Sequence, residues 1–307
     1  MLRTIGFRLL QAVIVVFCLE TFTMVTVRLT PGGPFADEKA MPKHIRERVE
    51  KEFGLDKTIP EQVVLNWKNF LKEGDFGLST SLFGRSVREI IFGAFPVSLT
   101  LGICAMIVAL LVGIPSGVIA ALRHNQLIDY ASMVVAMIGI CIPAFVLGPL
   151  LQLWVARNAD WLSTAGWERP SDVILPAITL GLAVAAYIAR LTRGGMLDVL
   201  SEDFIRTARA KGVSPFKIIT RHALRPALLP AVTYMGPAFA AIITGSFVVE
   251  TIFQVPGMGQ HFVTAVTSKD YFLLQGLVLF YGLLLAGANL TVDILLATMN
   301  PRLRANH

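Results

Sequence analysis

Six apolar stretches, each long enough to cross a lipid bilayer as a helix, constrain this chain more than any other feature. A bilayer core is spanned by about 20 apolar residues, because an α-helix rises about 1.5 Å per residue. The stretches cover residues 9–29, 95–122, 130–156, 173–191, 227–253 and 272–299. Since 54% of the residues are hydrophobic and only 16% are charged, a soluble domain could not bury this apolar surface. The sequence therefore predicts an all-α membrane protein with six transmembrane helices.

The first apolar stretch could also be a signal peptide, because Arg3 and Arg8 precede it. It is too long for an ordinary signal peptide, however, and it carries Glu20 in its middle. The sequence "RLTPGGP" that follows lacks the small residues of a cleavage site. We therefore expect this stretch to be a retained helix.

Basic residues are distributed unevenly between the two sides of the predicted helices. With a cytoplasmic amino terminus, 13 Lys and Arg residues fall on the inner side, eight of them between Arg190 and Arg225. The short loops on the other side carry only Arg157, Arg169 and Lys269. The positive-inside rule then predicts that both termini are cytoplasmic and that the segment 30–94 lies outside. The net charge of +6 is explained by this topology, so we do not expect nucleic-acid binding.

The segment 30–94 shows amphipathic periodicity in place of continuous apolar sequence. Apolar residues repeat at helical spacing around 45–53 and 63–71, and each run is followed by a glycine. These runs predict two short helices. A third, over residues 87–95, is expected to lie along the membrane interface before turning into the second span. The segment is either a cap that shields the bundle or a docking surface for a soluble partner.

Three carboxylates lie inside or beside the predicted spans. A carboxylate at the bilayer centre costs roughly 2.5–3.5 kcal/mol, so each should face protein or water. Glu250 and Asp293 lie near span ends, where they can reach the interface or a polar neighbour. Glu20 lies deepest. It either lines a translocation path or pairs within the bundle, and a proton relay is a further alternative.

Small residues and prolines inside the spans predict close and bent helix packing. Small residues four apart occur as Gly113 with Gly117, as Gly181 with Ala185 and Ala189, and as Gly282 with Ala286. This spacing lets helix backbones approach one another. Pro115, Pro143 and Pro237 predict bends. The three cysteines lie in apolar runs without metal-ligand spacing, so neither a disulfide nor a metal site is expected.

A basic loop of about 35 residues separates the fourth and fifth spans, and it is longer than an ordinary connection. Ser201 is expected to start a helix that ends at Gly212, and Ser214 with Pro215 to start a second one that runs to Pro226, where the fifth span opens. The loop also contains apolar side chains that it can hardly bury alone: Phe204, Ile205, Phe216, Ile218 and Ile219. These features favour docking of a partner protein. The alternative is a basic loop that lies on anionic lipid.

The sequence of this loop, "RTARAKG" followed by "RHALRPALLP", resembles the cytoplasmic coupling loop of bacterial ABC importer permeases of the oligopeptide and dipeptide branch. The resemblance extends along the chain through "RLTPGGPF", "GDFGLS", "FPVSLTLG", "YMGPAFAAIITGSFVVETIFQVPGMGQ" and "NPRLR". Within that branch the chain is most similar to the B-type transmembrane subunit of oligopeptide permease.

This resemblance implies a type I ABC importer permease bundle with a small extracytoplasmic helical insertion. Its parts would be 1–29 (cytoplasmic start and first span), 30–94 (insertion), 95–299 (permease core with the coupling loop at 192–226) and 300–307 (cytoplasmic tail). The residues implied in coupling to an ATPase are Arg206, Thr207, Ala208, Lys211, Gly212, Ser214 and Pro215. The general importer signature begins Glu-Ala-Ala, whereas Arg206, Thr207 and Ala208 stand here; Asn300 stands where relatives often have Asp.

The resemblance also implies a set of partners in the bacterial inner membrane. These are a second homologous permease, two cytoplasmic ATPase subunits, an extracytoplasmic peptide-binding protein and membrane lipid. The chain has no Gly-x-x-x-x-Gly-Lys-Ser/Thr phosphate loop, so ATP and Mg would be used by the partner subunits, and we expect no catalytic residue in this chain. The cargo could instead be dipeptides, nickel complexes, murein peptides or a sugar. A proton-coupled secondary transporter acting through Glu20 is the alternative from another class.

Overall fold

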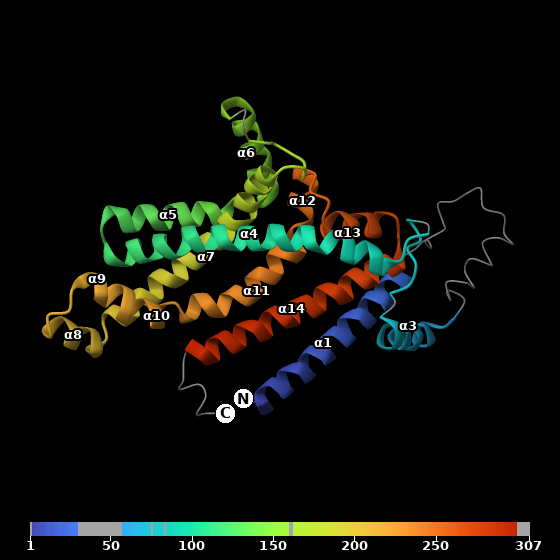
Figure 1. Cartoon of the computed structure of the whole chain (residues 1–307), viewed down its shortest axis with the longest axis horizontal. Helices are drawn as coiled ribbons and strands as arrows, with labels where there is room; N and C mark the ends of the chain where they lie inside the picture. Colours follow the sequence, from blue (N-terminus) through green and yellow to red (C-terminus); the bar gives the residue numbers. More distant parts are fainter. Residues whose placement is uncertain (1, 30–56, 75, 83, 160–161, 300–307) are drawn as a thin grey trace. The chain divides into compact units, whose positions relative to one another are not determined.

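The computed structural model describes residues 2–29, 57–74, 76–82, 84–159 and 162–299. Regular structure in these residues is helical, apart from one isolated β-bridge between Leu78 and Ser86 (Figure 1). Among the residues described, four helices are long and apolar enough to cross a membrane, and the number rises to six if each of two bent helix pairs counts as one span. The expectation of an all-α membrane protein is therefore confirmed.

The long helices extend further than the apolar stretches alone indicate. They are α1 (Leu2–Leu29), α4 (Val87–Leu122), α7 (Ile174–Leu200) and α14 (Tyr271–Met299). α7 ends at Leu200, nine residues beyond the stretch predicted to end at Leu191. The residues of this extension are partly small and partly polar, so they continue the helix although they do not continue the apolar stretch. α4 begins at Val87 and is unbroken, so the predicted turn between an interface helix and the second span is wrong.

The other two predicted spans are interrupted. The third consists of α5 (Leu127–Cys141) and α6 (Ala144–Asn158), which meet at 105°. Pro143 stands at the break as the residue before α6, and its missing N–H prevents the α5 hydrogen-bond pattern from continuing. The fifth predicted stretch, 227–253, is divided into α11 (Leu229–Gly245) and α12 (Phe247–Phe253). The second bent pair joins the helical residues Pro215–Ala227 to Leu229–Thr244 at 52°. Pro115 and Pro237, also expected to bend their spans, interrupt neither α4 nor α11.

The chain forms two compact units, and each is described separately. Unit 1 comprises Met1–Ile5, Ser98–Val255 and Gly287–His307. Unit 2 comprises Gly6–Val97 and Pro256–Ala286. Unit 1 also contains the short 3₁₀-helix η1 (Pro170–Val173). Unit 2 also contains α3 (Ile59–Glu73) and α13 (Met258–Thr267).

Unit 1 is built on close contact between α4 and α7. Methyl groups placed at Gly113 and Gly117 of α4 would overlap the carbonyl oxygens of Ala185 and Ala189 in α7. In the reverse direction, a methyl group at Gly181 of α7 would meet the carbonyl oxygen of Ala105 at 2.6 Å. The small residues predicted on these two helices therefore lie in one shared interface. They set the distance between α4 and α7.

Glu250 of unit 1 has polar neighbours, as its position near a span end led us to expect. Its side chain is fully buried, and its Oε1 accepts hydrogen bonds from Ser98 Oγ at 2.8 Å and from Ser246 Oγ at 2.6 Å. These contacts satisfy the carboxylate within the bundle.

In unit 2, the helix expected around 63–71 is α3, which ends at Gly74 in the left-handed conformation. The helix expected around 45–53 lies outside the described residues. The "GDFGLS" region leads into a loop that Asp270 holds in place: its Oδ2 accepts hydrogen bonds from Ser79 Oγ and from the backbone N–H and Oγ of Ser81. Because Asp270 immediately precedes α14, this network joins the loop before α4 to the start of α14.

Candidate functional site

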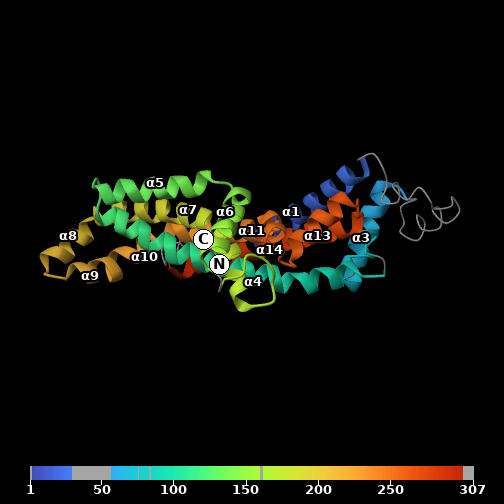
Figure 2. The ribbon, with the colours of Figure 1, turned by 90° about the horizontal axis from the view of Figure 1, so that it is seen from above.

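The segment that connects α7 to α11, here called the corner loop (residues 201–228), projects from one end of unit 1 (Figures 1 and 2). It begins with α8 (Asp203–Ala210). The residue that caps α8 is Glu202, not Ser201 as expected. Ser201 instead ends α7, where its Oγ donates a hydrogen bond to the carbonyl oxygen of Asp198. The helix start was misassigned by one residue, because α7 extends to Leu200 and leaves Ser201 as its C-terminal cap residue, so that the extended Glu202 precedes α8.

Gly212 makes the corner, as its sequence position predicts. Its φ is +74°, in the left-handed region that residues with a Cβ enter at a cost. The Gly212 N–H donates to the carbonyl oxygen of Arg209, and the Val213 N–H donates to that of Ala208. These two bonds form a Schellman motif, which satisfies the last carbonyl groups of α8 while reversing the chain. A Cβ at Gly212 would meet no atom within 4 Å, so the requirement for glycine is conformational.

The second half of the corner loop is a helix with one wide turn. Ser214 precedes it in an extended conformation and Pro215 occupies its first turn, both as predicted. The helix starts as α9 (Pro215–Lys217), widens into the π-helix η2 (Ile218–Ala223) and continues as α10 (Leu224–Ala227). The wide turn places Ile218 and Ala223, five residues apart, in the same buried cluster. The next helix, α11, then starts at Leu229 rather than at Pro226, which lies inside α10.

Several apolar side chains of the corner loop are buried within unit 1. Ile205 and Ala208 of α8 pack with Ile218, Ala223 and Ala227 of the second helix. The same cluster includes Ala121 at the end of α4 and Met196 in α7. As expected, the loop does not bury these residues alone: the ends of α4 and α7 cover Ile205 and Ile218, which are therefore not available to a partner. The corner is thus a packed extension of two long helices.

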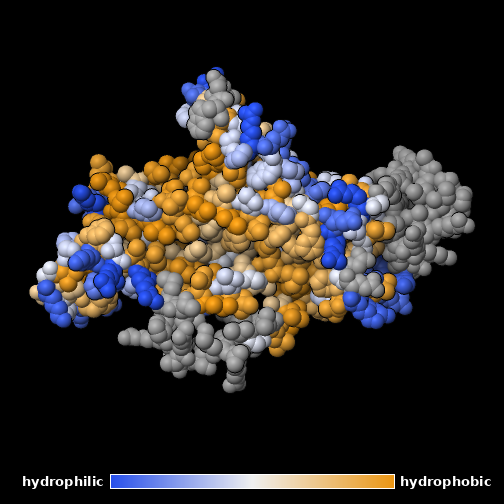
Figure 3. All heavy atoms as spheres, viewed as in Figure 1, coloured by the Kyte–Doolittle hydropathy of each residue, from blue (hydrophilic) through white to orange (hydrophobic). Residues whose placement is uncertain are grey.

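Two aromatic side chains of the corner loop remain exposed. Phe204 is 47% exposed and Phe216 is 75% exposed. Exposed basic residues lie near them in the sequence, at Arg206, Arg209 and Lys217, and hydrophilic residues gather over α8 in Figure 3. Arg206 Nη1 lies 3.4 Å from Asp203 Oδ1, but both side chains are largely exposed and the pair contributes little stability. An exposed aromatic pair within a basic surface is typical of a protein-binding site.

The structure divides the residues that the resemblance implied in coupling. Six lie on the exposed surface of the corner loop: Arg206, Thr207, Lys211, Gly212, Ser214 and Pro215. Ala208 is 9% exposed and belongs to the buried cluster beneath α8. It therefore contributes to the packing of the corner loop and not to its exposed surface. Glu20 belongs to unit 2 and is not part of this surface.

An ion-pair cluster beside the corner loop was not foreseen from the sequence. Arg193 of α7 donates from Nε to Asp129 Oδ1 at 2.6 Å and from Nη2 to Asp129 Oδ2 at 2.7 Å. The backbone N–H of Asn125 also donates to Asp129, and His124 Nδ1 lies 3.3 Å from it. Asp129 is 1% exposed. The cluster holds the connection between α4 and α5 against α7. On α7 it lies about one helical turn before Met196, which belongs to the buried cluster under the corner loop. The available signal was an acidic residue directly before the apolar stretch 130–156.

These features describe a multi-pass membrane protein whose two core helices end in a rigid, exposed corner. The fold is that of the transmembrane permeases of type I ABC importers. The fold agrees with an inward-facing structure of the MetNI methionine ABC transporter, with a TM-score of 0.59 at 15% identity, over 69% of this chain and 96% of that one.

Sequence comparison identifies the family. Residues 113–305 match the family model described as "Binding-protein-dependent transport system inner membrane component". The chain is 44% identical over 306 residues to the oligopeptide transport system permease protein OppB of Haemophilus influenzae, covering 99% of this chain and 100% of that protein. It is 40% identical to the dipeptide transport system permease protein DppB of Bacillus subtilis, covering 94% of each. The chain therefore belongs to the binding-protein-dependent transport permeases.

Proposed function

We propose that this chain is a transmembrane permease subunit of an ATP-driven importer of oligopeptides. The observation that carries the proposal is the corner loop: a left-handed glycine joins two helices whose inner faces pack on α4 and α7, while Phe204 and Phe216 stay exposed. The names of its relatives support a peptide as the cargo.

The corner loop explains how a chain without a nucleotide-binding loop can use ATP. One of the two cytoplasmic ATPase subunits would bind the exposed surface around Phe216 and move it as the two subunits close on ATP and Mg. The cluster that contains Ile205, Met196 and Ala121 would pass this movement to α7 and α4, because a close-packed cluster moves as a body. Rocking of the helices would then open the transport path alternately to the two sides.

The proposal includes further partners and an orientation in the bacterial inner membrane. A second homologous permease would complete the transport path within the lipid, and an extracytoplasmic binding protein would deliver the peptide to the side that carries residues 30–94. Both termini and the 192–226 loop would be cytoplasmic. A cysteine at Lys68 should then react with an impermeant thiol reagent added outside intact cells, whereas one at Lys217 should not. The reverse pattern would refute this orientation.

The cargo is proposed as oligopeptides, and dipeptides are the next candidate. A relative in Escherichia coli, 39% identical over 311 residues, is named as a glutathione transport permease, so small peptides of several kinds occur among the names of the relatives. Nickel complexes and murein peptides are alternatives within the same superfamily. Uptake of labelled di-, tri- and pentapeptides in competition would rank them.

The decisive experiment for this function is peptide uptake by the complete complex in proteoliposomes with its binding protein. Uptake should require ATP inside the compartment that holds the ATPase subunits, and it should not respond to a proton gradient alone. Uptake that continues without ATP while a gradient is held would refute the proposal and favour a secondary transporter.

A further inference from the structure

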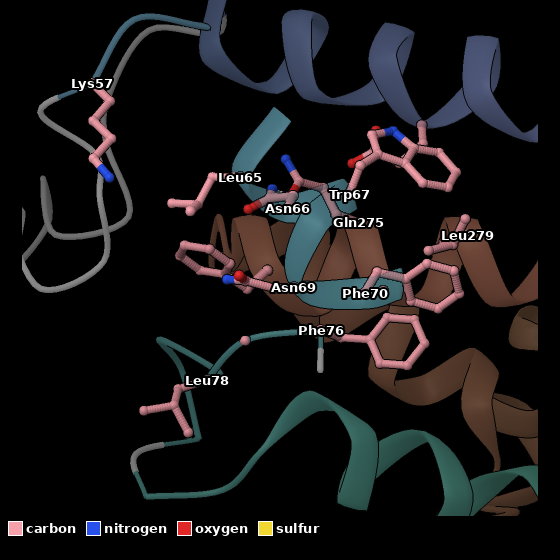
Figure 4. A pocket seen from close by; sticks show the side chains of 14 residues that line it. Lys57, Leu65, Asn66, Trp67, Asn69, Phe70, Phe76, Leu78, Gln275 and Leu279 are labelled. Carbon is pink, nitrogen blue, oxygen red and sulfur yellow. Dashed lines mark hydrogen bonds between the residues drawn. The ribbon is translucent and has the colours of Figure 1, made fainter. Parts of the chain in front are cut away.

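Unit 2 contains a cavity of about 260 Å³ between α1, α3, α14 and the loop that precedes α4 (Figure 4). Aromatic rings form much of its wall, including Trp67, Phe70 and Phe76. Amide groups add polarity: Asn66 Nδ2 donates a hydrogen bond to Gln275 Oε1 at 2.9 Å, which joins α3 to α14 beside the cavity. The wall thus combines π faces with fixed amides.

Glu20 of α1 also lines this cavity. The residue is 4% exposed, and its Oε2 has no hydrogen-bond partner among the described residues. The indole of Trp67 is the group that the fold brings to this carboxyl. Trp67 Nε1 is likewise without a hydrogen-bond partner in the described part of the chain. Buried polar groups are almost always paired, and a buried carboxylate without a partner is especially unfavourable.

Among the described residues that line the cavity, Lys57 is the other ionisable residue besides Glu20. Lys57 is exposed, whereas Glu20 is buried. A ligand that enters would therefore find a positive charge at the solvent-exposed part and a negative charge within. Ammonium groups bind both carboxylates and aromatic faces, and this wall offers both.

We propose that this cavity binds the primary ammonium group of a small zwitterionic ligand, with the ammonium at Glu20 and the anionic part toward Lys57. Pockets that enclose whole drug-sized ligands measure about 300–1,000 Å³, so this cavity accommodates one terminal group of a larger molecule. Two molecules supply that chemistry: the amino terminus of a peptide, which rests on the proposed transport function, and the ethanolamine headgroup of a phospholipid, which does not.

The peptide arm of the test uses the full-length chain with its co-purifying subunits in phosphatidylcholine nanodiscs. Binding of trialanine is compared with that of N-acetyl-trialanine, which lacks the ammonium group. Wild type should prefer trialanine by about tenfold or more, the range expected for a hydrogen bond to a charged group. Glu20→Gln, which keeps the shape of the side chain, should remove this preference. Glu89→Gln should retain it, because Glu89 is an exposed carboxylate of unit 2 that does not line the cavity.

The lipid arm measures retention of phosphatidylethanolamine against phosphatidylcholine by native mass spectrometry of the same variants. Phosphatidylcholine is the matched control, because its methylated headgroup cannot donate the hydrogen bonds of a primary ammonium. A preference for phosphatidylethanolamine that Glu20→Gln abolishes would assign the cavity to lipid, and this result would stand even if peptide import failed. An effect in the peptide arm alone would assign it to peptides.

The proposal is overturned if wild type shows neither preference, a result that requires no folded variant. It is also overturned if Glu20→Gln, shown to be folded by an unchanged thermal transition, keeps the preference of wild type. If Glu20→Gln does not fold, Trp67→Phe replaces it, since this change removes the Nε1 donor and keeps an aromatic ring. The Trp67→Phe variant should alter the preference at least threefold, and an unaltered preference would contradict the assignment.

Discussion

Gly195 of α7 lies so close to Ala227 of α10 that a methyl group at Gly195 would overlap the carbonyl oxygen of Ala227. The close approach fixes the end of the corner loop against the helix from which the loop started. It lies beside Met196, which belongs to the buried cluster under the corner. Movement of the corner loop must therefore displace α7 as well.

The first prediction concerns this contact. Gly195→Ala should separate α7 from α10 and lower both peptide uptake and transport-coupled ATP hydrolysis severalfold, because the overlap is with backbone and cannot be relieved by a side-chain rotation. Gly194→Ala is the matched control, since a methyl group there would meet no atom within 4 Å. The two variants should be compared in proteoliposomes at equal protein content. Equal activity of both would contradict the role of the contact.

The second prediction concerns the left-handed conformation at Gly212. Gly212→Val should destabilise the corner by roughly 1–2 kcal/mol and impair coupled ATP hydrolysis while leaving membrane insertion intact. Gly212→Asn should be milder, because Asn tolerates the left-handed region. Since there is open space around this position, a graded series from Asn to Ala to Val would indicate a conformational cause. Normal coupling in the Val variant would refute the rigid corner.

The third prediction separates packing from partner contact. Ile205→Ala removes a fully buried side chain and should lower the free energy of unfolding by about 2–5 kcal/mol. Phe216→Ala removes a largely exposed ring and should leave thermal stability nearly unchanged. Its effect should appear in assembly with the ATPase subunits, measured by co-purification and by stimulated ATP hydrolysis. A Phe216 variant with normal assembly and normal hydrolysis would place the contact elsewhere.

The fourth prediction follows from the hydrogen bonds of Asp270. Burial alone would raise the pKa of Asp270, but the hydrogen bonds from Ser79, Ser81 and Leu273 outweigh burial and lower it from its ordinary value of 3.8. A carboxyl with a lowered pKa in the folded state stabilises the fold above its unfolded pKa. That stability is lost as the pH falls from about 4 through the lower folded pKa.

Asp270→Asn should therefore lower stability at pH 7, by about 1.5–3 kcal/mol. The difference from wild type should shrink as the pH is lowered below about 4. Thermal unfolding in detergent at pH 7, 4 and 3 measures both effects, with the exposed Asp198→Asn as the control. A difference that stays constant across this range would show that the charge of Asp270 does not matter.

The sequence predicted the helical class because apolar runs of membrane length have few other solutions. It also predicted the Gly212 corner and the Ser214–Pro215 start, since both depend on local backbone chemistry. The break at Pro143 was expected only as a bend, because sequence does not reveal whether neighbouring contacts hold two helix halves in line. The depth to which Ile205 and Ile218 are buried depends on α4 and α7, which are distant in sequence.

The pairing of Arg193 with Asp129 shows a second limit. Both residues are visible in the sequence, but they are 64 positions apart and no periodicity links them. Arg193 therefore counted only toward membrane topology. In the same way, Glu20 could be recognised as costly within a span, whereas its placement in a cavity beside Trp67 depends on how α3 packs in unit 2.

The central claim is that the exposed surface of the corner loop binds an ATPase subunit, and site-directed cross-linking tests it most directly. Cys18, Cys104 and Cys141 are first replaced by Ser, and a single cysteine is then placed at Phe216 or, as the control, at Lys68 of α3. With a short bifunctional thiol reagent and an active complex, the Phe216 position should cross-link to the ATPase subunit and the Lys68 position should not. An active complex in which the Phe216 position forms no cross-link to that subunit would contradict the account.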